Sequence, residues 1–294
     1  MLLSEVSKIG GLDVIRDAPF QTLGFLSNPE PGMLVFVEDE RCLALLERTP
    51  EAVCVITTAE LAHRAVRCAG CATSASPRRS FHLVHSHLAN CGFYWSDFKS
   101  AIHPSARIHP RAYIAEKNVR IGPGTQIGPN ASIMERSLLG ADVVIGPGVV
   151  IGSVGFQSGR FDGRLEEMVH AGGITIADRA HILANAVVAS ALFGQPTQIG
   201  ADVRIGNCAF VSHNVRIGKA SYIGHGAVVN GSVSVGEEVW VGPGASLVHG
   251  TRIGDHAHIA IGSVVIGNVE PGQKVAGNFA IEQTALLKHL ASIR

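Results

Sequence analysis

The residues best suited to chemistry are two histidines and a glycine at regular spacing. His213 and His249 lie 36 residues apart, and Gly231 lies midway between them. Histidine is a suitable general base at neutral pH, because its ordinary pKa is about 6.5. A backbone N–H that no side chain shields can hold an oxyanion, and a base beside such an N–H is what acyl transfer requires. The spacing therefore predicts an acyl-transfer site, with His213 as the base and Gly231 as the oxyanion donor.

The elements that position these residues follow from a six-residue repeat. This period fits neither an α-helix nor a flat strand, but it fits short strands that form the three sides of a solenoid coil of about 18 residues. Such coils stack about 4.8 Å apart through backbone ladders. The repeating aliphatic residues form a first series of Ile102, Ile108, Ile114, Ile121, Ile127, Ile133, Leu139, Ile145 and Ile151, and a second series of Ile199, Ile205, Val211, Ile217, Ile223, Val229, Val235, Val241, Leu247, Ile253, Ile259 and Val265.

The coil predicted from this repeat brings the candidate residues to one edge. His213 and His249 are two coils apart, about 10 Å by ladder spacing, with Gly231 on the coil between them. Each follows a core aliphatic by two positions, which predicts a corner whose side chain faces an outer groove. His225 comes 12 residues after His213, so we expect it on a different edge. Glycine is frequent directly after the aliphatic, where we expect it to relieve the strain of the corner.

Two insertions interrupt the repeat. The longer runs from Gly152 to Gly173, and the shorter surrounds the segment FGQPT at residues 193–197. Insertions in a solenoid become loops on its surface, and such loops commonly form the walls of a binding site. The alternative is that they are surface loops with no role in binding.

The repeat also divides the chain into three parts. Residues 1–100 lack it and alternate strand-like runs (33–37 and 52–58) with helix-like runs (40–48 and 58–69), which predicts a small α/β domain. Residues 101–277 form the β-helix, and residues 278–294 are expected to form one closing helix. The fold class is therefore mainly β.

Composition excludes several classes of function. Lys+Arg and Asp+Glu are equal at 24 each, so no net charge favours a nucleic-acid partner. No apolar run is long enough for a membrane span, and the first residues do not form a signal peptide. The six cysteines are scattered and do not suggest a disulfide framework. We expect a cytoplasmic protein.

Three other sites compete with the predicted one. Cys208 is a candidate nucleophile, but it is five residues from His213 and should lie on another edge. Cys68 and Cys71 have the spacing of half a zinc site and lack a second pair. A metal-dependent hydratase would need several histidines around one ion. Candidates for that role are His213, His225, His249, His256 and His258, but none forms a convincing adjacent pair. We expect neither a metal nor a bound cofactor.

The chain resembles a known family over essentially its whole length. A small α/β domain precedes the hexapeptide repeat, the long insertion begins Gly-x-x-Gly-Phe at residues 152–156, and residues 210–218 read FVSHNVRIG. These features are similar to those of the UDP-3-O-acylglucosamine N-acyltransferases of lipid A biosynthesis. The resemblance implies a left-handed β-helix and a homotrimer with each site between neighbouring prisms.

The same resemblance assigns residues to roles. It places the catalytic base at His213 and the oxyanion-hole glycine at Gly231. The predicted substrate-binding residues are Asn214, His249, Phe36, Gly155 and Phe156. Phe36 corresponds to the aromatic residue with which the family's N-terminal domain grips uracil.

Some positions depart from the family. Asp39 and Cys42 stand where the uracil-binding Asn and Tyr are expected, and Gly206 and Val154 stand where the family has Asp. The family's pattern places its second histidine at the position after His249, where this chain has Gly250. These departures bear on the substrate rather than on the fold or the type of reaction.

We therefore expect an N-acyltransferase that moves an acyl group from an acyl carrier protein to the amine of a nucleotide-linked amino sugar, as in lipid A-type biosynthesis. Arg216 and Arg252 are expected to bind the donor, together with Arg204 and Lys219 in one basic patch. Acyl-coenzyme A is the alternative donor, because residues 275–278 read VAGN as in coenzyme A-dependent transferases of dideoxy-amino sugars. A non-catalytic β-helix scaffold is the alternative from a different class.

Overall fold

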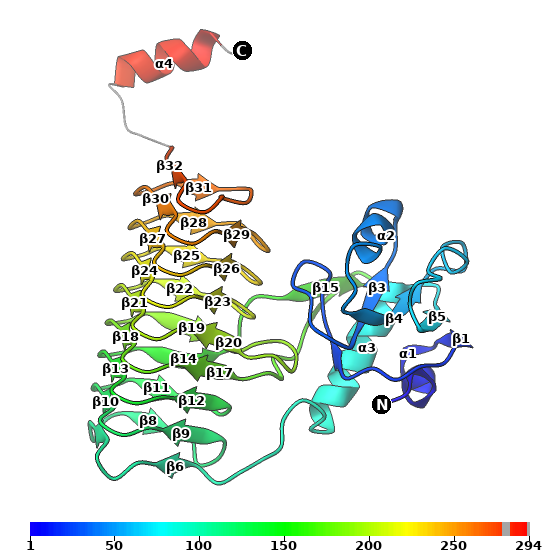
Figure 1. The fold of residues 1–294 in the computed structure, drawn as a ribbon, viewed down its shortest axis with the longest axis horizontal. Coiled ribbons are helices and arrows are strands. Elements are labelled where there is room, and N and C mark those ends of the chain that lie inside the picture. The colour runs from blue at the N-terminus through cyan, green and yellow to red at the C-terminus, as the bar shows by residue number, and fades with distance from the viewer. Residues whose placement is uncertain (278–282, 293–294) are drawn as a thin grey trace.

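The computed structural model describes residues 1–277 and 283–292, which form a β-helix, an N-terminal α/β domain beside it and a C-terminal helix (Figure 1). The α/β domain contains a five-stranded sheet in the order β1-β5-β4-β3-β2. β1 is antiparallel to β5, and the other pairs are parallel. The domain consists of η1 (Leu3–Val6), α1 (Ser7–Gly10), β1 (Asp13–Arg16), β2 (Thr22–Leu23), β3 (Met33–Val37), α2 (Glu40–Leu46), β4 (Ala52–Thr57), β5 (Gly70–Thr73) and α3 (Pro77–Asn90).

The structure corrects the helices expected in this domain. α2 occupies most of the predicted run 40–48, but the run 58–69 forms turns rather than a helix. The helix that carries the domain's packing is instead α3, which begins with Pro77 in its first turn and buries Phe81, Val84 and Leu88. Proline is well suited to the first turn of a helix because its missing N–H would be unsatisfied there in any case.

The β-helix is left-handed, and three parallel sheets form its faces. The first face is β7 (Arg107–Ile108), β10 (Gln126–Ile127), β13 (Val144–Ile145), β18 (His181–Ile182), β21 (Arg204–Ile205), β24 (Tyr222–Ile223), β27 (Trp240–Val241), β30 (His258–Ile259) and β32 (Lys274–Val275). The second face is β8 (Tyr113–Ile114), β11 (Ser132–Ile133), β14 (Val150–Ser153), β19 (Val187–Ala189), β22 (Phe210–Val211), β25 (Val228–Val229), β28 (Ser246–Leu247) and β31 (Val264–Val265). The third face is β6 (Ala101–Ile102), β9 (Val119–Ile121), β12 (Ser137–Leu139), β17 (Ile174–Ile176), β20 (Thr197–Ile199), β23 (Arg216–Ile217), β26 (Ser234–Val235) and β29 (Arg252–Ile253).

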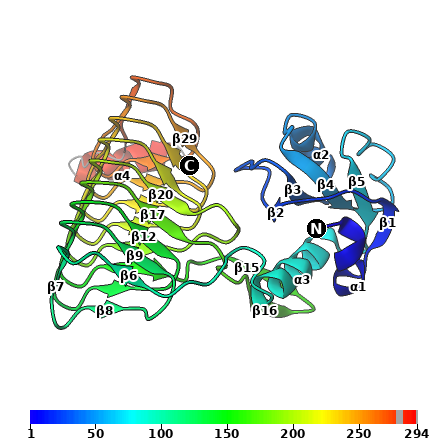
Figure 2. The same ribbon diagram turned by 60° about the horizontal axis from the view of Figure 1, so that its bottom comes forward.

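The predicted register of the repeat is confirmed. Ile217 pairs with Val235 and Val235 with Ile253, so residues 18 apart lie on adjacent coils. The repeating aliphatic residues form one continuous core, in which Val211 and Val229 are completely buried. Figure 2 looks more nearly along the stack and shows triangular coils with the α/β domain beside one edge.

The corners differ from the expected arrangement. The strained, left-handed conformation belongs to the third residue after the aliphatic, such as Asn214 (φ 56°) and Ser232 (φ 60°). The glycines directly after the aliphatic are needed for another reason: a Cβ on Gly218 would lie 2.4 Å from the carbonyl oxygen of Gly236 on the next coil. These glycines therefore allow the coils to stack closely.

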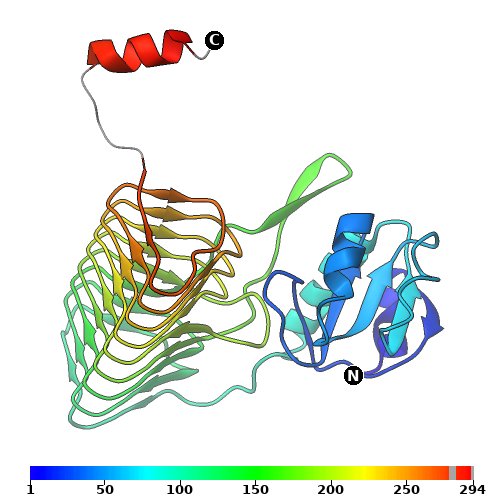
Figure 3. The same ribbon diagram turned by 45° about the horizontal axis from the view of Figure 1, so that its top comes forward.

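The long insertion forms an antiparallel hairpin of β15 (Ser158–Phe161) and β16 (Arg164–Glu167), which reaches from the coils to the α/β domain (Figure 3). The C-terminal helix α4 spans Gln283–Ser292, and the rest of the predicted segment 278–294 lies outside the described residues. Among the described residues, no helix has the length and apolar character of a membrane span.

Candidate active site

The predicted catalytic residues all lie on one edge of the prism, where the chain passes from the second face to the third. His213 lies between β22 and β23, Gly231 between β25 and β26, and His249 between β28 and β29. His225 and Cys208 lie on the edge between the first and second faces, as the spacing predicted. We call the edge that carries His213 the histidine edge.

Both insertions leave the coils at the histidine edge. The long loop (residues 154–173) connects β14 to β17, and the short loop (residues 190–196) connects β19 to β20. Phe193 of the short loop is 2% exposed and inserts into the aromatic core of the α/β domain, with its ring centroid 5.1 Å from that of Phe25 and 5.8 Å from that of Phe81. The short loop is therefore not ornamental, because it fixes the α/β domain against the site.

The long loop makes a second connection to the α/β domain. His85 of α3 forms a hydrogen bond of 2.7 Å between Nε2 and the carbonyl oxygen of Val169. Met168 is buried in the same apolar cluster as Phe193. The N-terminal loop adds a direct contact to the edge, since Asn28 Nδ2 donates to the backbone oxygen of Asn214 over 3.4 Å.

His213 is buried, with 2% of its surface exposed, whereas the repeat predicted an open corner. The reason is the long loop: a Cβ on Gly155 would lie 3.4 Å from Cδ2 of His213, so the loop backbone covers the ring. Burial lowers the pKa of His213 to about 4. The imidazole is therefore neutral at cellular pH.

Asn214 determines which nitrogen of His213 carries the proton. Its amide orientation is fixed because Oδ1 accepts the Leu192 N–H over 2.9 Å and Nδ2 donates to the carbonyl of Gln195 over 3.4 Å. Oδ1 also lies 3.3 Å from Nδ1 of His213. Because Oδ1 only accepts, Nδ1 of neutral His213 must carry the hydrogen. Its Nε2 is then left as a free proton acceptor.

Gly231 lies directly against this free nitrogen. A Cβ built on Gly231 would come within 2.5 Å of both Nε2 and Cε1 of His213, so no larger residue fits. The Gly231 N–H has no hydrogen-bond acceptor among residues 1–277 and 283–292. His213 and Gly231 are therefore in contact on adjacent coils, and their roles as base and oxyanion donor stay predictions.

No feature of the repeat pointed to His170, which is the third histidine near this edge. It lies on the long loop outside the repeat, is 9% exposed, and its ring centroid is 5.7 Å from that of His213. The ring of His249 is 6.1 Å from that of His213 on the other side. An irregular insertion has no period from which this contact could be predicted.

A cavity of about 260 Å³ lies between the α/β domain and the histidine edge. Phe25 and Phe36 supply aromatic walls, with ring centroids 6.4 Å apart, and His249 lines the side toward the β-helix. The guanidinium carbon of Arg78 lies 5.4 Å from the centre of the Phe36 ring. The predicted substrate residues Phe36 and His249 are thus brought together from distant parts of the chain.

Three other positions are clarified by the structure. Phe156 is 87% exposed, because the backbone that turns Gly155 toward His213 carries it outward, and its role in substrate binding stays a prediction. Asp39 caps α2 by accepting the N–H of Cys42 over 2.7 Å. Cys42 lines the cavity described above, whereas Asp39 does not.

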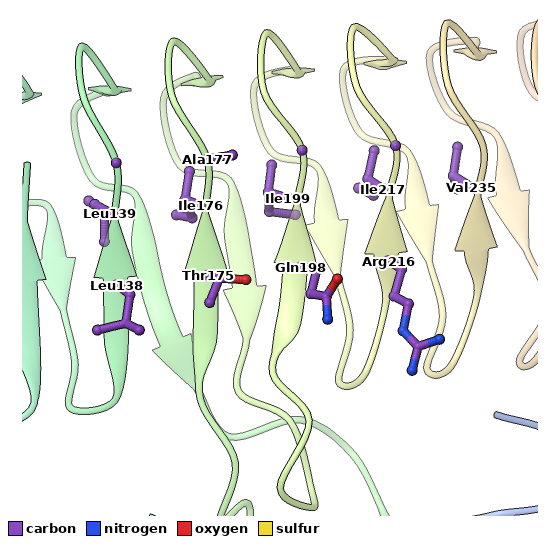
Figure 4. Close-up of a pocket in the computed structure, with 13 residues that line it drawn as sticks. Leu138, Leu139, Thr175, Ile176, Ala177, Gln198, Ile199, Arg216, Ile217 and Val235 are labelled. Atoms are coloured by element: carbon purple, nitrogen blue, oxygen red, sulfur yellow. The ribbon is translucent and has the colours of Figure 1, made fainter. Parts of the chain in front are cut away.

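The predicted donor residues lie on the third face. Arg216 and Arg252 occupy the same outward position two coils apart, with Ser234 between them. Figure 4 shows Arg216 in line with Gln198, Thr175 and Leu138 on the outside of this face, while Ile217 and Ile199 belong to the inner row.

The predicted inclusion of Arg204 in this patch is wrong, because Arg204 lies in β21 of the first face. Arg216 also has an acidic neighbour, Glu30 of the α/β domain, which is 2% exposed. Burial raises the pKa of Glu30 to about 7, and the positive charge of Arg216 opposes this rise.

The competing sites remain separate from this arrangement. Cys68 and Cys71 are buried in the α/β domain, where burial raises the pKa of both thiols. Among the described residues, no three His, Cys, Asp or Glu side chains converge in a way that could hold a metal ion.

Comparison with known proteins identifies the repeat. The family model described as bacterial transferase hexapeptide (six repeats) matches residues 118–153 and 196–231. The six-residue repeat is therefore confirmed, and its occurrence in transferases agrees with the expected class of enzyme. A search of curated proteins finds no match.

Several solved structures are similar. The UDP-N-acetylglucosamine acyltransferase LpxA of Bacteroides fragilis is 23% identical, over 65% of this chain and 78% of that chain, with a TM-score of 0.46. A UDP-N-acetylglucosamine acyltransferase of Arabidopsis is 20% identical over 64% and 77%, with a TM-score of 0.43. PerB of Caulobacter crescentus, in complex with CoA and GDP-perosamine, is 18% identical over 81% and 73%, with a TM-score of 0.24. At these identities the likeness is one of fold, and the chemistry of this chain depends on its own residues.

Proposed function

We propose that the protein is an N-acyltransferase that moves an acyl group from a thioester to the amine of a nucleotide-linked amino sugar. The observation that carries this proposal is the neutral His213, whose free Nε2 lies beside Gly231, a residue with no side chain and with an unpartnered N–H among the described residues. A base and an oxyanion donor are the two groups that a direct acyl transfer needs.

In the proposed reaction, the amine nitrogen of the acceptor attacks the thioester carbonyl while Nε2 of His213 takes a proton from it. The carbonyl oxygen becomes an oxyanion, which the Gly231 N–H holds. Collapse of the tetrahedral intermediate breaks the C–S bond, and the departing thiolate receives the proton from His213. Oδ1 of Asn214, 3.3 Å from Nδ1, stabilises the imidazolium that forms in between. No protein nucleophile is required, since the amine itself attacks.

The acceptor is proposed to occupy the cavity between Phe25, Phe36 and His249. Aromatic walls suit the planar base of a nucleotide, and Arg78 supplies a positive charge at the same wall. The sugar amine would then extend past His249 toward His213. The resemblance to the UDP-3-O-acylglucosamine N-acyltransferases favours a UDP-glucosamine derivative of lipid A-type biosynthesis, with Gly155 in the wall of the site.

The donor is proposed to be an acyl carrier protein, because Arg216 and Arg252 place two positive charges on one face of a protein without net charge. Acyl-coenzyme A is the alternative donor. The working assembly is proposed to be a homotrimer, as the resemblance implies.

The test is an assay of thioester consumption. The protein is incubated with acyl carrier protein or coenzyme A thioesters and with UDP-, GDP- and dTDP-linked amino sugars, and the products are analysed by mass spectrometry. An amide product with at least one acceptor supports the proposal, and the preferred pair names the substrates. Absence of amide with every pair, while nucleotide sugars still bind, would indicate a non-catalytic scaffold instead.

A further inference from the structure

Among the described residues, His170 is the one ring in contact with His213 that the proposed reaction does not use. Its Nε2 accepts the N–H of Gly155 over 3.1 Å, and its Nδ1 lies 3.2 Å from the carbonyl oxygen of Met168. A nitrogen that accepts an N–H carries no hydrogen, so His170 is neutral and holds its proton on Nδ1. Both hydrogen bonds join His170 to its own loop and thereby close that loop upon itself.

The backbone of His170 is fixed from two other directions. Nη1 of Arg136 on the histidine edge donates to the carbonyl of His170 over 3.1 Å. The preceding carbonyl, of Val169, is bonded to His85 of α3. The position of the His170 ring therefore depends on both the β-helix and the α/β domain.

The ring in turn determines where Gly155 lies. A Cβ on Gly155 would be 2.8 Å from Nε2 of His170 and 3.4 Å from Cδ2 of His213, so this backbone lies beside both rings. Residues on either side of Gly155 face outward, since Val154 is 67% and Phe156 is 87% exposed. Among the described residues, the bond to His170 is the only hydrogen bond that the Gly155 N–H makes.

We infer that His170 is a positioning residue for His213: by accepting the Gly155 N–H, it holds the long loop over the catalytic ring and keeps water from it. This inference rests on the proposed function of His213. The burial of His213, at 2% exposed, is the direct consequence. The acceptor amine can reach Nε2 only when this cover moves, so the His170–Gly155 bond sets how easily the site opens.

Two substitutions separate the roles of the two ring nitrogens. In His170→Gln the side-chain oxygen reaches the place of Nε2 and still accepts the Gly155 N–H. In His170→Asn the shorter amide reaches only the place of Nδ1, so the bond to Met168 is kept and the one to Gly155 is lost. If His170 had only a structural role, His170→Gln and His170→Asn would have the same effect on His213.

The measurement is the exchange of the imidazole C2 hydrogen for deuterium, followed for each histidine by mass spectrometry over a range of pH. It reports the pKa and solvent access of His213 without requiring turnover. The titratable groups that face the ring are His170 and His249. We expect the His213 midpoint of about 4 in the parent and in His170→Gln. In His170→Asn we expect it to rise by at least about one unit toward the ordinary value, with faster exchange.

Gly155→Ala is the second variant, since its added Cβ displaces His170 without removing the imidazole. It should reproduce the effect of His170→Asn on His213. In steady-state assays, both variants should lower the KM for the acceptor more than they change kcat, because the cover then opens more easily, and His170→Gln should keep the parent values. His213 exchange that is unchanged in both His170→Asn and Gly155→Ala would overturn the inference. If the variants show the predicted changes in His213 exchange but the parent protein shows no acyl transfer, the proposed function is contradicted and the inference about His170 is not.

Discussion

The imidazole of His213 lies against the α-carbon of Gly231, 18 residues later on the next coil, with no room for a side chain between them. The contact brings the Cα of Gly231 beside Nε2, and the Gly231 N–H has no hydrogen-bond acceptor in the described part of the chain. Neither residue alone is unusual for a hexapeptide corner. Their stacking produces the pair of groups on which the proposed acyl transfer depends.

Gly231→Ala should reduce acyl transfer by roughly 100- to 1,000-fold, because its Cβ would displace the base and obstruct the oxyanion donor. Gly267→Ala is the matched control. Gly267 occupies the equivalent corner two coils beyond Gly231, and a Cβ there meets nothing within 4 Å. Similar losses in both variants, measured as kcat/KM, would mean that the effect is one of corner geometry and not of the site.

The pH dependence of kcat/KM should reflect the buried state of His213. The base acts when neutral, and burial lowers its pKa to about 4. Activity should therefore be retained as the pH falls below 6 and should be lost as it passes through about 4. An acid limb at the ordinary histidine pKa of about 6.5 would show that His213 is solvated when the acceptor binds.

Phe193→Ala should release the α/β domain from the β-helix. The ring is 2% exposed between Phe25 and Phe81, and removal of a buried Phe side chain costs about 3–5 kcal/mol. We expect faster proteolysis between residues 91 and 100 and a higher acceptor KM. Circular dichroism of the β-helix should not change, and a variant with parent KM and parent cleavage would contradict this role of the short loop.

Neutralising the donor patch should weaken the use of acyl carrier protein. The variant with Arg216→Gln and Arg252→Gln should raise the KM for this donor and reduce its dependence on salt. Glutamine is preferred to glutamate because Arg216 has the buried Glu30 as a neighbour. Arg204→Gln on the first face is the control. Equal KM values for the parent, the double variant and Arg204→Gln would show that Arg216 and Arg252 do not bind the donor.

Much of the β-helix could be predicted from the sequence because its order is periodic. An aliphatic residue at every sixth position determines both the inner rows and the coil, so residues such as His213 and Gly231 could be placed on one edge. Periodicity also placed His225 and Cys208 elsewhere. The glycines directly after the aliphatic residues were expected to relieve strain at the corners, and this was wrong. They allow close contact between adjacent coils, which the pattern within a single corner does not show.

The cover over the site could not be predicted in this way. The long loop has no period, so neither the contact of His170 with His213 nor the outward direction of Phe156 follows from spacing. The burial of His213 depends on backbone from this loop, and a corner position alone suggests exposure. Likewise, Phe193 is a loop residue in sequence and a core residue in space, since its partners come from the α/β domain.

The most direct test of the account is the rate of amide formation by His213→Ala with the preferred donor and acceptor. His225→Ala is the control, because His225 occupies the same corner position on another edge. Loss of a general base lowers a rate by roughly 100- to 10,000-fold. We predict a loss of this size for His213→Ala, with a parent-like circular dichroism spectrum, and a nearly unchanged rate for His225→Ala. A rate for His213→Ala within about threefold of the parent would contradict the assignment of His213 as the base.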